Sequence, residues 1–142
     1  MEASGIRQSR TFPAGSATSG DTCQPWVVGT FFDGLDRMHA MSTVIIDRPA
    51  GSAHPRFPTV RYPIDYGYLE GTTGGDGEGV DVFVGSAPGV GVVAAAVTVD
   101  LARRDTEVKI LADCSSVEVD TIADFLTNVL GLCVHLVRRD GR

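Results

Sequence analysis

The sequence predicts a single α+β domain that is rich in β-strand. Short β-branched and apolar runs recur along the chain, and glycines or prolines separate each run from the next. The most regular helical pattern comes late, after residue 115. The chain has 142 residues, of which 43% are hydrophobic and 21% charged, and this suits one domain with a real core. Together these features indicate a small sheet or barrel with helices packed against it.

The first third of the chain divides into an unpatterned segment and a short helix. Residues 1–28 are rich in Ser, Gly, Thr and Ala without any hydrophobic period. We therefore expect a disordered N-terminal extension, followed by the domain at residues 29–142. Residues 31–41 carry apolar side chains at positions 31, 35, 38 and 41, a spacing typical of a short amphipathic helix. Gly34 weakens this helix prediction.

Four segments after this helix have the composition of strands, and they cover residues 43–46, 80–84, 90–99 and 107–113. Three prolines and a glycine make residues 47–58 a loop. The Tyr- and Gly-rich stretch that begins at residue 62 is also predicted as loop. Alternation along the last of the four strands places Lys109 on the same face as Glu107 and Leu111.

One helix and one strand complete the predicted fold. Ser115 and Glu118 have the spacing of a capping box, which marks a helix start. Apolar residues then repeat at positions 119, 122, 123, 126 and 130, and Gly131 stands where a C-terminal cap belongs. Residues 133–137 form the final predicted strand, and Cys114 and Cys133 at the two ends of the helix are expected in the core.

Composition excludes several classes of function. The net charge of −6 argues against nucleic-acid binding, which requires a basic face. No apolar stretch reaches the roughly 18 residues that a membrane span requires, so no membrane interaction is predicted. Three cysteines without CxxC spacing or paired histidines argue against zinc and against a disulfide framework. Inert thiols of this kind are typical of a reducing cytosol, and we expect a cytoplasmic protein.

The most informative segment is YPIDYGYLEGTTGGDGEGVDVFV, residues 62–84. It contains three acids within six residues, Asp76, Glu78 and Asp81, and glycines separate them. Carboxylate oxygens suit the hard cations Mg²⁺, Mn²⁺ and Ca²⁺, and glycine allows the sharp turn that converges them. Without a cation such a cluster is destabilised by like-charge repulsion. The turn is therefore a candidate cation site, with a solvated hairpin turn as the alternative.

A second acidic pair, Asp100 and Asp105, flanks the connection between two predicted strands. If these strands are antiparallel neighbours, both acids and the turn at 76–81 can gather at one end of the sheet. Five carboxylates would then surround one pocket, with Lys109 nearby. Such a site could hold more than one divalent metal ion and leave coordination positions for phosphate oxygens and water.

These motifs together resemble the signature of the soluble family I inorganic pyrophosphatases. In that family a YP-x-NYG-[YF] segment precedes the motif DGDP-[VI]-DV. The stretch from residue 45 to residue 139 is similar to a compact bacterial branch that reads IDRP-x-G-x-x-HPR-[YF]-P, YP-[LI]-DYGYL, GGGIDVWVGS, TVDL and KIL. The resemblance covers about two-thirds of the chain and implies a small OB-like β-barrel with a helix in the C-terminal half.

The resemblance also implies roles for the acidic residues. Asp76 and Asp81 match the first and last aspartates of the DGDP-[VI]-DV motif, which bind metal. Glu78 matches the middle aspartate, which holds and activates the attacking water. Asp100 and Asp105 match the later aspartate pair that completes the metal site. On this basis Asp76, Asp81, Asp100 and Asp105 would hold two or more Mg²⁺ ions.

Four further residues would contact the substrate if the resemblance holds. Tyr66 matches a tyrosine that contacts a phosphate, and Lys109 lies near the position of a lysine with the same role. Asp47 stands where the family has an acidic residue on the rim of the site, and Arg56 approximates a basic phosphate ligand in the same loop. Arg138 and Arg139, at the end of the last predicted strand, are candidates for the family's missing C-terminal phosphate ligands.

The predicted function is Mg²⁺-dependent hydrolysis of inorganic diphosphate by a metal-activated water, and the resemblance leaves a homo-oligomer open. Two positions depart from the motif. Glu78 is one methylene longer than aspartate, which can misplace a water and reduce the rate by ~10²-fold, and Gly79 replaces a proline. Two alternatives therefore stay open. One is an enzyme of the same fold for another phosphoanhydride or phosphoester, and the other is a non-catalytic module that binds metal or phosphate.

Overall fold

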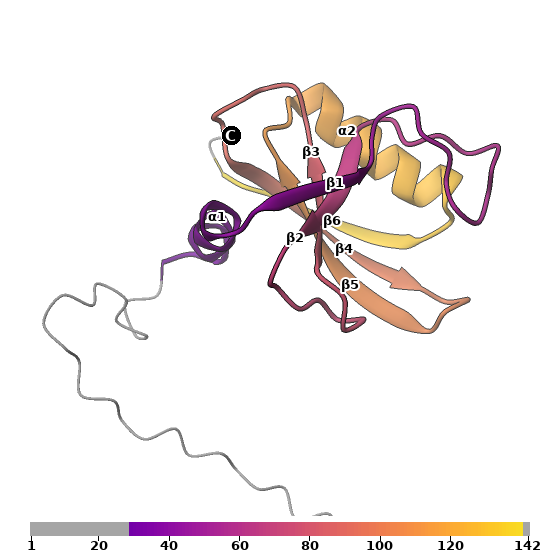
Figure 1. Ribbon diagram of the computed structural model, residues 1–142, viewed down its shortest axis with the longest axis horizontal. Coiled ribbons are helices and arrows are strands. Elements are labelled where there is room, and N and C mark those ends of the chain that lie inside the picture. Colours follow the sequence, from indigo (N-terminus) through magenta and orange to yellow (C-terminus); the bar gives the residue numbers. More distant parts are fainter. Residues whose placement is uncertain (1–28, 141–142) are drawn as a thin grey trace, which may run out of the picture.

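A computed structural model describes residues 29–140, so the predicted extension at 1–28 lies outside the described residues. Two helices, a π-helical turn and six strands make up this part of the chain (Figure 1). None of the helices in the described part is long and apolar enough to cross a membrane. In chain order the elements are α1 Phe31–Met41, β1 Val44–Arg48, β2 Asp65–Leu69, β3 Val80–Val84, β4 Val92–Asp100, β5 Asp105–Ala112, α2 Ser116–Asp124, η1 Phe125–Val129 and β6 Cys133–Arg138.

The six strands form one mixed sheet in the order β1-β2-β3-β5-β4-β6. Every neighbouring pair is antiparallel except β3 and β5, which run parallel. Strands β1 and β6 pair on one side only within residues 29–140, so the strongly twisted sheet does not close. The predicted α+β, β-rich fold class is confirmed.

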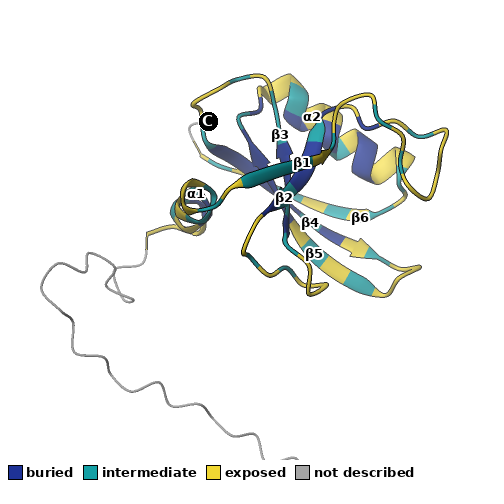
Figure 2. Ribbon diagram, viewed as in Figure 1, coloured by how far each residue is buried: buried dark blue, intermediate teal, exposed yellow. Residues whose placement is uncertain are grey.

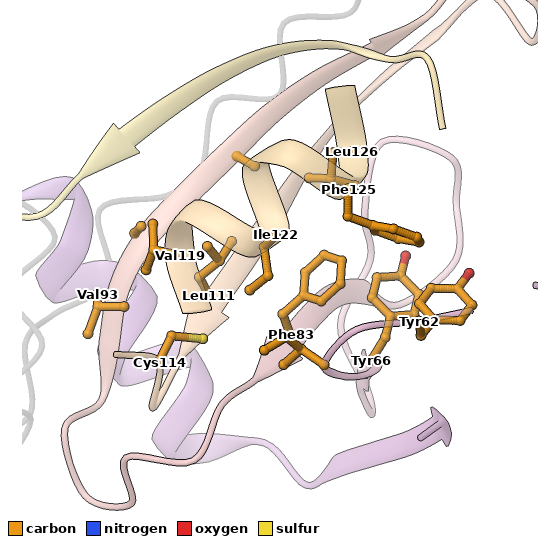
Figure 3. Close-up of a cluster of buried hydrophobic side chains, with 13 residues drawn as sticks. Tyr62, Tyr66, Phe83, Val93, Leu111, Cys114, Val119, Ile122, Phe125 and Leu126 are labelled. Carbon is orange, nitrogen blue, oxygen red and sulfur yellow. The ribbon is translucent and has the colours of Figure 1, made fainter. Parts of the chain in front are cut away.

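Two apolar clusters cover opposite faces of the central strands. On β5, Leu111 packs into the cluster beneath α2, while Ile110 packs into the cluster beneath α1. This alternation follows from the two-residue period of a strand. Figure 2 shows buried residues concentrated on the central strands, whereas α2 exposes one side and buries the other. The helix contributes Val119 and Ile122, and η1 adds Phe125 and Leu126 to the same cluster (Figure 3).

Both helices begin with capping boxes. The Ser115 hydroxyl accepts the backbone N–H of Glu118, and the Glu118 carboxylate accepts the N–H of Ser115, as the sequence predicts. Thr30 and Asp33 form the same reciprocal pair at the start of α1. After η1 the chain turns at Gly131, which has a φ of +70°, a conformation that favours glycine.

The predicted loop at residues 62–69 is wrong in part, because residues 65–69 form β2. The strand lies between β1 and β3 and pairs with both. Its sequence, DYGYL, gives a mixed signal, because the two tyrosines favour a strand whereas the aspartate and the glycine disfavour one. Gly67 is required by this pairing, since a Cβ atom there would lie 1.7 Å from the carbonyl oxygen of Ile45 on β1. Tertiary pairing, rather than local propensity, therefore makes this segment a strand.

Candidate functional site

A pocket of about 510 Å³ opens between the sheet and the loop that joins β1 to β2. Strands β1 to β5, the β2–β3 turn and the β4–β5 turn all contribute to its wall. In Figure 1 the β2–β3 connection and the β4–β5 hairpin project from the same end of the sheet. All nine residues that the sequence singles out as catalytic, substrate-binding or metal-binding line this pocket. They are Asp47, Arg56, Tyr66, Asp76, Glu78, Asp81, Asp100, Asp105 and Lys109.

The second acidic pair reaches the pocket through the β4–β5 hairpin. The two strands are antiparallel neighbours, and Asp100 and Asp105 are direct partners at the end of the ladder. The Asp100 carboxylate accepts the N–H groups of Ala102 (3.0 Å) and Arg103 (3.1 Å), which fixes the turn. The Asp105 carboxylate lies 3.6 Å from the guanidinium of Arg103. The expectation that this connection brings both acids to one end of the sheet is confirmed.

The acidic turn lies directly against β5. A Cβ atom on Gly75 would come within 2.7 Å of the carbonyl oxygen of Thr106, so the turn backbone touches the strand. The Asp76 carboxylate accepts the N–H of Glu78 at 2.9 Å. Partial burial alone would raise the pKa of Asp76, but hydrogen bonds involving Glu78 and Glu107 outweigh it and keep the pKa below its ordinary value. Asp76 is therefore an anion, and both it and Glu78 are exposed.

Lys109 is the positive centre of the pocket. Its ammonium donates to Asp81 Oδ2 at 2.7 Å, to Glu107 Oε2 at 2.8 Å and to Tyr66 Oη at 3.2 Å. The residue is only 7% exposed. Strand alternation puts Glu107 and Lys109 on one face, as predicted, and the parallel pairing of β3 with β5 brings Asp81 beside them.

Electrostatics keep this centre in defined protonation states. Burial alone would lower the pKa of Lys109, but Tyr66, Asp81 and Glu107 outweigh burial and hold the pKa well above its ordinary value. Burial, reinforced by Asp81, raises the pKa of Tyr66 despite the opposing effect of Lys109. The lysine therefore stays charged and the tyrosine stays a neutral hydroxyl at physiological pH.

The carboxylates have the right chemistry for a hard cation but are not arranged around one. Among residues 29–140, no group of three or more His, Cys, Asp or Glu side chains lies close enough together to hold a metal ion. Asp81, one of the four predicted metal ligands, directs an oxygen to Lys109 instead. The oxygen donors fit Mg²⁺ by type, and the four-aspartate metal site stays a prediction.

Several residues of the pocket carry no role in the sequence prediction, among them Glu107, Arg48 and His54. Glu107 accepts from Lys109, and its position two residues before the lysine is the signal that could have identified it. Arg48 donates to the hydroxyl of Tyr62 at 2.8 Å, and its guanidinium lies 5.6 Å from the centre of the Tyr66 ring. His54 also lines the pocket. Burial, together with the nearby Arg48 and Arg56, lowers the pKa of His54, so the imidazole is neutral at pH 7.

An aromatic ladder forms one side of the pocket. His54 stacks on Tyr62 with ring centres 5.7 Å apart, and Tyr62 stacks on Tyr66 at 5.2 Å. Tyr66 in turn contacts Phe83 at 4.7 Å, and Phe125 of η1 packs on Tyr62. Figure 3 shows the two tyrosine rings side by side, with their hydroxyl groups at one end of the buried cluster. The ladder fixes the position of the Tyr66 hydroxyl beside Lys109.

Arg138 and Arg139 do not line this pocket. Arg138 pairs with Asp120 on α2, and Arg139 pairs with Asp33 and Asp36 on α1. Their suggested role as phosphate ligands is therefore not supported, because both guanidinium groups attach helices to the sheet. The basic residues that do face the pocket are Lys109, Arg48, Arg56 and Arg103.

Comparison with known proteins finds similarity among solved structures. An inorganic pyrophosphatase from the pathogenic bacterium Helicobacter pylori matches with a TM-score of 0.51 and 17% identity, over 68% of this chain and 84% of that one. An inorganic pyrophosphatase from Coxiella burnetii has a TM-score of 0.48 and 22% identity, over 68% of this chain and 82% of that one. An inorganic phosphatase from Anaplasma phagocytophilum gives 0.49 and 20%, over 67% and 82%. No family model and no curated protein sequence matches the chain.

The match to the Helicobacter pylori structure carries the conclusion about the fold. At 17% identity it concerns the arrangement of the chain rather than its chemistry. It agrees with the predicted OB-like architecture, here with a sheet that stays open between its edge strands β1 and β6 over residues 29–140. The chain therefore has the fold of the inorganic pyrophosphatases.

Proposed function

We propose that this protein hydrolyses inorganic diphosphate, supplied as its magnesium complex, to two phosphates. The observation that carries the proposal is the pocket, which gathers all nine predicted site residues from five strands and two connections on a pyrophosphatase fold. These residues are far apart in the sequence, and their convergence does not follow from the strand pattern alone. The pocket also holds both charge types that a metal-complexed polyanion requires.

In this proposal Asp76, Asp81, Asp100 and Asp105 face the magnesium ions. Their carboxylate oxygens are the ligands that Mg²⁺ takes in proteins. Bound there, Mg²⁺ would neutralise diphosphate charge and make water a stronger acid. Asp76 is held ionised by its hydrogen bonds, so it needs no deprotonation before it serves as a ligand.

The remaining residues act on the water and on the phosphates. Glu78 lies on the pocket rim with an exposed carboxylate, where it can orient an attacking water and accept its proton. Lys109 and Arg56 supply positive charge to the leaving phosphate, and the neutral Tyr66 hydroxyl can donate to a phosphate oxygen. Asp47, exposed near the end of β1, contributes a further carboxylate to the wall of the pocket.

Phosphate release from magnesium diphosphate by the purified protein tests the proposal directly. Wild-type protein should release phosphate, and Asp81→Asn should release it at least ~100-fold more slowly because a charged ligand is lost. No release by the wild type would reject the activity. Release that is unchanged in Asp81→Asn would reject this pocket as the site.

A second candidate substrate is a phosphoanhydride that carries an organic group. The pocket wall includes apolar side chains from the β1–β2 loop, from the start of η1 and from the residues that follow η1, and Phe57 of the loop is 49% exposed. A volume of about 510 Å³ falls in the range of roughly 300–1,000 Å³ typical of pockets for organic ligands. Nucleoside diphosphates assayed beside diphosphate distinguish the two, because a higher kcat/KM for the nucleotide would favour this alternative. Metal binding without turnover of either substrate would indicate a non-catalytic module.

A further inference from the structure

The ammonium of Lys109 has no hydrogen-bonding capacity left for a substrate. A lysine ammonium has three N–H donors and no acceptor. Here three acceptors surround it, the carboxylates of Asp81 and Glu107 and the hydroxyl of Tyr66, at 2.7, 2.8 and 3.2 Å. The side chain is 8% exposed. In this arrangement Lys109 neutralises the carboxylates of the pocket and cannot bond a phosphate without losing a partner.

The same contact constrains Asp81. One of its oxygens is bonded to the ammonium, and the carboxylate lies in the half-buried wall of the pocket. A divalent cation that binds Oδ2, or both oxygens, of this carboxylate must compete with Lys109 for it. The two predicted roles, Asp81 as a metal ligand and Lys109 as a phosphate ligand, therefore conflict with this contact when the cation binds Oδ2 of Asp81.

We propose that Lys109 is an internal counter-cation that a divalent cation displaces from Asp81, and that the displaced ammonium then contacts the anion bound with that cation. The inference rests on the proposed function for the identity of the anion. It accounts for both predicted roles with one movement, since breaking a single contact frees a carboxylate for the cation and a donor for the phosphate.

Charge and chain geometry favour such an exchange. A divalent cation carries twice the charge of the ammonium, and carboxylate oxygens are its preferred ligands. Lysine presents a compact charge on a flexible four-carbon stem, so Nζ can move while the strand stays in place. Glu107 and Tyr66 can keep two of its three hydrogen bonds during the shift. Asp76 lines the same pocket with an exposed carboxylate and adds negative charge that attracts the incoming ion.

The competing interpretation is a permanent structural ion pair. In that case Lys109 and Asp81 stay bonded whether or not a cation is present, and any metal ion uses the other carboxylates. The two interpretations differ in whether the Lys109 ammonium leaves Asp81 when a cation binds, so an experiment that follows this one side chain can distinguish them.

Lysine-specific isotope labelling provides the test, because Lys109 is the only lysine of the chain. Protein with ¹³Cε,¹⁵Nζ-lysine gives one side-chain signal, and exchange of its Nζ protons with water reports burial and bonding. We expect slow exchange in the free protein and exchange at least ~10-fold faster with saturating Mg²⁺. Inorganic phosphate added together with Mg²⁺ should slow the exchange again. Calorimetry that detects Mg²⁺ binding while the lysine signal stays unchanged would overturn the inference, as would failure of Mg²⁺ to bind.

Metal affinity measured on variants gives an independent readout. Lys109→Met removes the ammonium that competes with Mg²⁺ for Asp81. Because this ammonium is expected to contact Asp81 more than 90% of the time, the apparent affinity of the variant for Mg²⁺ should be ~10-fold higher or more. Arg48→Met is the matched control, because it removes a positive charge from the same pocket but does not touch Asp81. We expect its Mg²⁺ affinity to change by less than about 3-fold. Equal changes in the two variants would indicate general electrostatics and reject displacement.

These experiments separate the inference from the proposed function. They use Mg²⁺ and phosphate without diphosphate, and the labelled wild type needs no substitution that could impair folding. Displacement of Lys109 in a protein that does not hydrolyse diphosphate would reject the function and leave the exchange intact. Hydrolysis of diphosphate by a protein whose lysine signal does not respond to Mg²⁺ would support the function and reject the displacement of Lys109.

Discussion

Gly67→Ala is expected to separate β1 from β2 and to disturb the pocket at the same time. The added Cβ atom would lie 1.7 Å from the carbonyl oxygen of Ile45, whereas ordinary contacts begin at 3.4 Å. The clash is with backbone, so no side-chain rotation relieves it. The strands must move apart by more than an ångström, which weakens the hydrogen bonds of a ladder with four paired positions.

The expected loss of stability follows from this geometry. At about 1 kcal/mol for each hydrogen bond weakened, plus strain in the sheet, the free energy of unfolding should fall by about 2–4 kcal/mol. Urea unfolding followed by circular dichroism measures it. Tyr66 precedes Gly67 in β2 and lines the pocket, so a shift of this strand should also lower any activity on diphosphate. Gly34→Ala is the control, since a Cβ atom there meets nothing within 4 Å and should stabilise α1 by about 0.5–1 kcal/mol. If Gly67→Ala is as stable as the wild type, the pairing described for β1 and β2 is wrong.

Three further predictions concern other parts of the domain. Glu118→Gln should lower stability by about 1 kcal/mol at pH 7, because hydrogen bonds from the capping box and from Ser86 N hold the pKa of Glu118 below its usual value. A lowered pKa adds stability above the unfolded value of 4.5, and this stability is lost as the pH falls through the lower pKa of the folded protein. The free energies of unfolding of the two proteins, measured in urea, should therefore converge as the pH falls below 4.5, and a gap that is constant with pH would contradict this. Arg139→Met should speed backbone amide exchange in α1 by roughly 10-fold and leave exchange in α2 unchanged, because this arginine joins α1 to the sheet. Equal changes in both helices would argue against that role. In a Cys23→Ser background, a thiol reagent at pH 8 should modify the exposed Cys133 of the native protein but not Cys114, whose burial raises its pKa to about 12; two thiols of equal reactivity would refute the assigned burial.

Local signals predicted most of the fold. The capping box at Ser115 fixed the start of α2, and Gly131 marked the turn after η1, because these features act within a few residues of the chain. The sequence predicts both strands and the short connection between them, and their antiparallel pairing, which the sequence leaves as a condition, brings Asp100 and Asp105 together. Cys133 was expected in the core and is exposed, because it begins an edge strand.

Features that depend on long-range pairing could not be predicted in this way. Strand β2 has a sequence with mixed strand propensity, DYGYL, and pairing with β1 on one side and β3 on the other stabilises it as a strand. The parallel pairing of β3 with β5 skips β4 in the sheet order, and no local pattern indicates such a connection. Arg138 and Arg139 were suggested as phosphate ligands from their position at the end of a strand, yet they point to acids on the helices.

The parallel pairing also explains why the one lysine of the chain lies where it does. Val82 pairs with Ile110, so the preceding residues, Asp81 and Lys109, meet on neighbouring strands, and Glu107 joins them from the same face of β5. Eleven of the twelve basic residues are arginines, whose planar guanidinium suits two parallel hydrogen bonds to one carboxylate. Three acceptors around a single buried point instead match the three donors of an ammonium. A lysine at this position is therefore favoured by the geometry of the pocket, and its compact charge is also the kind that a divalent cation can replace.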